Sequence, residues 1–130
     1  MLILAIRTDK PESEIGLFDD LNKLTYLKWQ AHLELAETIH KKVSALLKDT
    51  LKSWHELNGL VVYKGPGSFT GLRIGIAFAN TLAYSLDIPI IGSTSEQWAE
   101  QGIKQLLDNK DEKNIVPEYG AEVRITLPKK

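Results

Sequence analysis

The chain has 130 residues, enough for one domain with its own hydrophobic core. Its 16 basic and 17 acidic residues give a net charge of −1, which argues against autonomous nucleic-acid binding, because such proteins carry a basic excess. The chain has no cysteine, which excludes disulfides, thiolate catalysis and cysteine-ligated zinc. The first apolar run, 2–6, is too short to cross a membrane and lacks the basic start of a secretory signal, so we expect a cytoplasmic protein without a membrane contact.

Three strands are predicted at the start of the chain. The first, Leu2–Ile6, is apolar at every position, as a strand covered on both faces tends to be. Glu14–Asp19 and Leu24–Trp29 follow as an antiparallel pair joined by a short polar turn. From Leu33 to Leu51 the apolar residues recur at three- and four-residue steps, which predicts an amphipathic helix.

Crossover units are predicted in the second half of the chain. A strand at Leu60–Tyr63 leads through a glycine-rich turn to a helix at Gly71–Leu86, and a short strand at Ile90–Gly92 follows. Residues 93–96, Ser-Thr-Ser-Glu, have the spacing of a capping box, so a third helix should run from Thr94 to Leu107. The tail, 115–130, contains a β-like run at Glu122–Leu127 that could add a strand.

The order β-β-β-α-β-α-β-α predicts an α/β fold with a mixed sheet. It is the layout of half an actin-like, sugar-kinase-like (ribonuclease H-like) fold, although other α/β sandwiches share it. We expect one such domain over 1–130, with a core at 1–114 and the tail at 115–130.

The glycine-rich turn, KGPGSFTGLRIG at 64–75, is the strongest local signal. It differs from the Walker A loop, because no Lys-Ser or Lys-Thr pair follows Gly71, and its glycine spacing is one residue too long for a dinucleotide fingerprint. Gly67, Ser68 and Thr70 could still contact an anion or a nucleotide at the start of the following helix. The alternative is a tight turn at Pro66 and Gly67, with Ser68 or Thr70 capping the helix.

Small residues form a ridge on the predicted second helix, since Gly71, Gly75, Ala79 and Ala83 fall at four-residue intervals. Such a ridge allows a close approach by either the chain's own sheet or a partner helix. We expect the helix pair 33–47 and 71–86 to be a partner-binding face. Its predicted contact residues are Leu35, Ile39, Val43, Gly71, Leu72, Gly75, Ala79 and Ala83.

The sequence offers no candidate for catalysis or for a metal. His32, His40 and His55 lack the spacing of a helical metal motif, and Ser68 does not lie in a nucleophile elbow. We therefore predict no catalytic residue, no metal ligand and no cofactor.

The glycine segment at 65–75, together with Ala79 and the run 89–95, closely resembles the TsaB (YeaZ) family. The opening strand 2–6, the run 31–34 and the tail segments 117–119 and 125–130 resemble the same family. The resemblance implies an actin-like subunit of the bacterial machinery that places threonylcarbamoyl on adenosine 37 of certain tRNAs. It implies a non-catalytic partner of the catalytic subunit TsaD, joined by the ATPase TsaE, with tRNA contacted only indirectly.

Two departures from the family bear on this expectation. Arg7 follows the first strand where members usually place an aspartate, which removes a carboxylate useful for coordinating a metal–nucleotide complex. The chain is also shorter than usual members, as though most of a second domain were absent, which would leave no interdomain cleft. Two alternatives stay open: a nucleotide-binding module that uses Gly65–Gly75, and a self-associating domain that forms a homodimer.

Overall fold

The computed structural model describes residues 1–119, and its element order confirms the predicted β-β-β-α-β-α-β-α arrangement. Two single 3-10 turns, His32–Glu34 and Trp54–Glu56, precede α1 and β4. The strands and helices are β1 Leu2–Arg7, β2 Glu12–Asp19, β3 Asn22–Gln30, α1 Leu35–Asp49, β4 Gly59–Tyr63, α2 Phe69–Leu86, β5 Ile90–Ser93 and α3 Trp98–Leu107.

The strands form one mixed five-stranded sheet in the order β3-β2-β1-β4-β5. β1 pairs antiparallel with β2, which pairs antiparallel with β3, and a two-residue turn at Asp20 and Leu21 joins β2 to β3. β1 pairs parallel with β4, and β4 with β5, as crossover connections through helices require. The central strand β1 is buried from Leu2 to Ile6, which explains why these five residues are all apolar.

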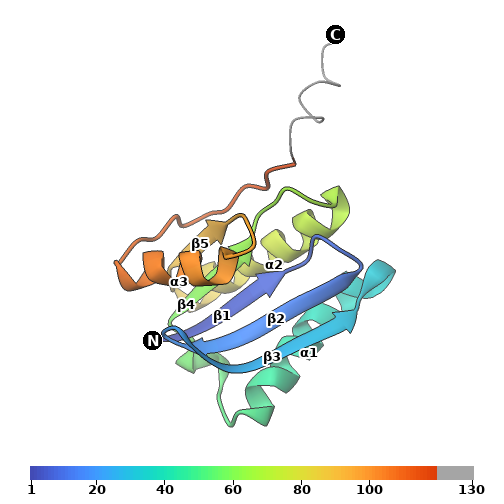
Figure 1. Cartoon of the computed structure of the whole chain (residues 1–130). Coiled ribbons are helices and arrows are strands. Elements are labelled where there is room, and N and C mark those ends of the chain that lie inside the picture. The colour runs from blue at the N-terminus through green and yellow to red at the C-terminus, as the bar shows by residue number, and fades with distance from the viewer. Residues whose placement is uncertain (120–130) are drawn as a thin grey trace.

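Helices cover both faces of the sheet. Figure 1 shows α3 on the near face, while α1 and α2 lie behind the sheet. The buried stripe of α1 is the one that its sequence predicts: Leu35, Ile39, Val43, Leu46 and Leu47. α3 approaches the sheet closely at Gly102, where a Cβ atom would collide with the side chain of Val61.

All three helices begin at a residue other than the predicted one, and α2 begins at Phe69, two residues before Gly71. α3 begins at Trp98 rather than Thr94, because Ser93 is the last residue of β5 and pairs with Tyr63. The predicted capping box does not form, since the N-cap of α3 is Gln97 and it makes no side-chain cap bond. α1 begins two residues later than predicted, after a 3-10 turn.

The tail is described only as far as residue 119. Ile115 is buried, and residues 115–119 form no strand. The strand considered for Glu122–Leu127 lies outside the described residues. Within residues 1–119, no helix is both long enough and apolar enough to cross a membrane.

Candidate functional site

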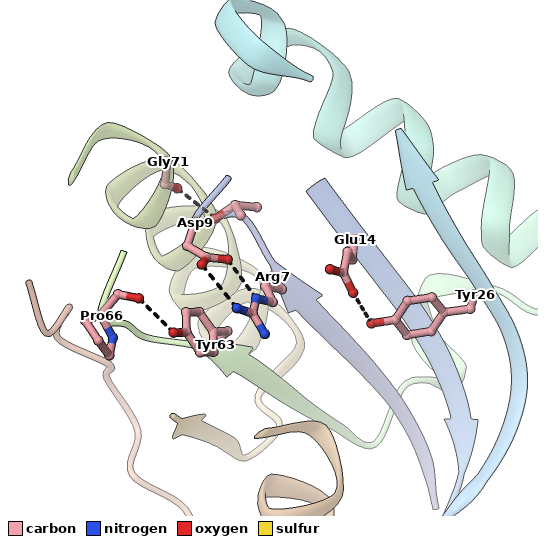
Figure 2. Close-up of polar contacts among 8 residues, drawn as sticks. Arg7, Asp9, Glu14, Tyr26, Tyr63, Pro66 and Gly71 are labelled. Atoms are coloured by element: carbon pink, nitrogen blue, oxygen red, sulfur yellow. Dashed lines mark hydrogen bonds and ion pairs between the residues drawn. The ribbon is translucent and has the colours of Figure 1, made fainter. Parts of the chain in front are cut away.

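The loops that follow β1 and β4 meet beside the start of α2 (Figure 2). β1 and β4 are parallel neighbours, so their carboxyl ends lie at one edge of the sheet. In open α/β sheets this edge is the usual place for a ligand. The chemistry of the site therefore depends on what these two loops present.

An ion pair lies at the end of β1. The Arg7 Nε and Nη2 atoms donate to the two carboxylate oxygens of Asp9, at 2.7 and 3.2 Å, and the guanidinium lies 4.0 Å from the centre of the Tyr63 ring. The side chains are 18% and 7% exposed, respectively. Burial lowers the pKa of Arg7, but the hydrogen bond and charge of Asp9 outweigh it, so the net shift is upward. The carboxylate is thus neutralised by its own loop.

The glycine-rich turn packs against the chain's own atoms. A Cβ atom at Gly67 would collide with the side chain of Asp9, and one at Gly65 would collide with the carbonyl oxygen of Glu118. The backbone N–H of Ser68 donates to the carbonyl of Asp9 at 3.1 Å. The glycines here make room for neighbouring backbone and side chains, as the tight-turn alternative requires.

The ridge of small residues on α2 has the same explanation. A Cβ at Gly71 would collide with the carbonyl oxygen of Thr8, and a Cβ at Gly75 would collide with the Thr8 side chain. Thr8 is fully buried, and its hydroxyl donates to the carbonyl of Gly71 at 2.7 Å. The close approach therefore comes from the chain's own β1 loop and not from a partner helix.

The predicted partner-binding residues mostly lie inside the fold. Six of them are 3% exposed or less: Leu35, Ile39, Val43, Leu72, Ala79 and Ala83. Gly75 is also buried, and Gly71 is half-buried. They cannot form an exposed contact face, and the prediction is wrong on this point, because the apolar faces of α1 and α2 cover the sheet and each other.

The outward-facing side of α2 was missed by sequence reasoning. We call it the outer face of α2, and it comprises the exposed residues Phe69, Thr70, Arg73, Ala77, Thr81 and Tyr84. Tyr84 is 90% exposed and Phe69 51%. Arg73 is the only charged residue in the 18 residues of α2. This scarcity of charge on solvent-facing helical positions is a sequence signal that could have found it.

The predicted anion contacts lie together at the start of α2. Gly67, Ser68 and Thr70 are exposed, and Ser68 is the N-cap residue. Its side chain makes no cap hydrogen bond, so the predicted capping by Ser68 or Thr70 is wrong. Ser68 and Thr70 line a hollow of about 200 Å³ with Lys10 and His32.

A second polar pair lies on β2 and β3. The Tyr26 hydroxyl donates to a carboxylate oxygen of Glu14 at 2.6 Å (Figure 2). Burial, followed by this hydrogen bond, raises the pKa of Tyr26 well above its ordinary value. Tyr26 is therefore a fixed hydrogen-bond donor. No group of three or more His, Cys, Asp or Glu side chains within residues 1–119 is placed to hold a metal ion.

Comparison with known proteins gives the family. Residues 30–109 match the family model of TsaD, tRNA N6-adenosine threonylcarbamoyltransferase. Over 99 residues, 73% of this chain, the sequence is 40% identical to the tRNA threonylcarbamoyladenosine biosynthesis protein TsaB of Bacillus subtilis. The chain belongs to the TsaB (YeaZ) family.

Solved structures show the same fold. YeaZ from Pseudomonas aeruginosa aligns with 78% of the chain at a TM-score of 0.67 and 23% identity. RuvC from Thermus thermophilus aligns with 75% of the chain and 66% of its own length at a TM-score of 0.53 and 12% identity. The predicted actin-like, ribonuclease H-like class is thereby confirmed. The chain spans 42% of the Bacillus TsaB and 50% of the Pseudomonas YeaZ structure.

Proposed function

We propose that the chain is a non-catalytic, TsaB-like scaffold subunit for N6-threonylcarbamoylation of adenosine 37 in tRNA. It binds a TsaD-like catalytic subunit in the cytoplasm, a TsaE-like ATPase joins through the complex, and tRNA is contacted only indirectly. Support comes from the 40% identity to a protein named for tRNA threonylcarbamoyladenosine biosynthesis. A match of residues 30–109 to the TsaD family also supports a place beside that enzyme.

The outer face of α2 is the observation that carries this proposal. Tyr84 and Phe69 expose large aromatic side chains, and Ala77 between them leaves the helix backbone easy to approach. Exposed aromatic residues on a surface with few charged side chains are typical of the centres of protein–protein interfaces. A homodimer would use the same face and would compete with the TsaD-like subunit.

The geometry of the glycine-rich turn favours a non-catalytic scaffold rather than an ATPase. The Asp9 carboxylate beside the turn is paired with Arg7, and Thr8 fills the space next to the ridge of α2. The space beside Gly67 is filled by the Asp9 side chain and the space beside Gly65 by the carbonyl of Glu118, so the turn packs against the chain's own atoms where a phosphate would have to lie. The reacting groups therefore belong to the partner in this proposal.

Depletion of the chain from the cells that encode it tests the function. The threonylcarbamoyladenosine content of their tRNA, measured by mass spectrometry of nucleosides, should fall. Re-expression of the wild type should restore the modification, and Tyr84→Asp should not. Leu107→Asp is the matched control, because Leu107 is an exposed apolar residue on α3, on the opposite side of the sheet. Unchanged tRNA after depletion would reject the proposed function.

A further inference from the structure

A shallow hollow lies over the amino-terminal half of the outer face of α2. Phe69, Thr70, Arg73, Ile74 and Ala77 line it, and its volume is about 310 Å³. Apart from Arg73 and the hydroxyl of Thr70, the lining is apolar. The hollow is therefore shaped for an apolar side chain, with one positive charge at its edge.

The Arg73 guanidinium lies over an aromatic ring at the edge of the helix. It lies 5.2 Å from the centre of the Phe69 ring. A cation–π contact needs none of the guanidinium N–H groups as hydrogen-bond donors, so these groups can form a bidentate pair with a partner's carboxylate. No acidic side chain within residues 1–119 forms an ion pair with Arg73, although Arg7 and Lys64 each have one.

The aromatic wall of the hollow is braced by the tail. The Phe69 ring packs on Tyr119, with 4.6 Å between the ring centres. Tyr119 is held because Ile115 exchanges two hydrogen bonds with the Asn80 side chain, at 2.8 and 3.0 Å, and because Glu118 pairs with Lys64 at 3.2 Å. Figure 1 shows this segment running from α3 back to the start of α2. A braced aromatic ring loses little conformational freedom on binding.

From this geometry we propose that Arg73 is the specificity-determining residue of the docking face. It receives a carboxylate from a protein partner, next to an apolar side chain of that partner that fills the hollow. This inference rests on the proposed function, which supplies the partner.

A carboxylate fits the surface better than a nucleic-acid phosphate. Phosphate backbones are bound by several basic side chains, and the charge of the whole chain is −1. Arg73 is the only charged residue of α2, and it lines the hollow together with the apolar residues Ile74 and Ala77. One arginine at the edge of an apolar hollow is typical of a protein interface, where arginine and aromatic residues concentrate.

Titration with the purified TsaD-like subunit of the same organism tests the assignment, with Kd measured for each variant by calorimetry. Arg73→Gln removes the charge and should raise Kd by about tenfold or more, and Arg73→Lys, which keeps the charge without the planar fork, should give a smaller loss. Lys104→Gln, which removes an exposed charge from α3, should stay within about twofold of the wild type. Unfolding midpoints measured for each variant confirm that the fold is intact.

The outcomes distinguish a failure of the carboxylate assignment from a failure of the proposed function. Loss of binding in Tyr84→Asp with a wild-type Kd in Arg73→Gln would overturn the carboxylate assignment and leave the docking face in place. No binding by the wild-type chain would overturn both. Measurable tRNA binding by the isolated chain that is lost in Arg73→Gln would also overturn the assignment, in favour of a phosphate.

Discussion

The contact between Thr8 and the small ridge of α2 gives a sharp prediction for Gly75→Ala. Alanine usually stabilises a helix interior by about 1 kcal/mol relative to glycine. Here the added Cβ collides with the side chain of Thr8, which is fully buried and fixed by its hydrogen bond to Gly71. Overpacking of this kind costs typically about 1–3 kcal/mol, and the upper end applies because Thr8 cannot move away. The expected net loss in unfolding free energy is about 2 kcal/mol.

A double-mutant cycle isolates this contact. Thr8→Ala alone should cost about 2 kcal/mol, from the lost hydrogen bond and the lost methyl group. In that background Gly75→Ala meets only a tight Cβ contact, so the helix preference should dominate and the second change should be neutral or stabilising. The coupling energy between the two positions is then about 2–3 kcal/mol.

Equilibrium urea unfolding, followed by circular dichroism, measures all four proteins. Two results would contradict a Thr8–Gly75 contact of this strength: stabilisation of the wild-type chain by Gly75→Ala, or additivity of the two changes to within about 0.5 kcal/mol. Either result would mean that the ridge does not owe its small residues to Thr8. Another contact within the fold would then have to explain Gly75, which is buried.

Further predictions concern the polar groups and the glycine-rich turn. Arg7→Met leaves the nearly buried Asp9 carboxylate unpaired and should lower the unfolding free energy by about 2 kcal/mol in urea, while Arg7→Lys should lose less. The raised pKa of Tyr26 keeps the side chain protonated in the folded state at pH values where an ordinary tyrosine ionises. Its contribution to the stability of the fold is therefore fully present below about pH 10 and is lost as the pH rises further. Above pH 10 the free energy of unfolding of the wild type should therefore fall more steeply than that of Tyr26→Phe, by up to about 1.4 kcal/mol per pH unit. Unfolding curves recorded at several pH values measure this difference. Calorimetry should detect no ATP or ADP binding with a Kd below about 100 μM, and tighter binding would favour the nucleotide-binding alternative.

The fold was predictable because its signals are local. The buried stripe of α1 is visible in a run of 15 residues, and the five consecutive apolar residues at the start of β1 indicate a central strand. The site was less predictable, because its contacts join distant segments. Thr8 and Gly71 are 63 residues apart, so the sequence could not say which neighbour needed the small ridge.

Two errors show how tertiary contacts override local patterns. The Ser-Thr-Ser-Glu run has the spacing of a capping box, but its first serine pairs in β5 and cannot start a helix. Arg7 in place of the usual aspartate suggests, from the sequence alone, that the site lacks a carboxylate. Asp9 restores one two residues later, and the pair neutralises itself.

The affinity of the chain for a TsaD-like subunit, measured with a changed outer face of α2, shows whether that face is the docking surface. Ala77→Arg places a long charged side chain in the middle of that face without disturbing the core, because Ala77 is exposed. Gln101→Arg makes an equivalent change at an exposed position of α3. We expect wild-type affinity for Gln101→Arg and at least a hundredfold weaker binding, about 2.7 kcal/mol, for Ala77→Arg. Equal binding by both variants would contradict this expectation.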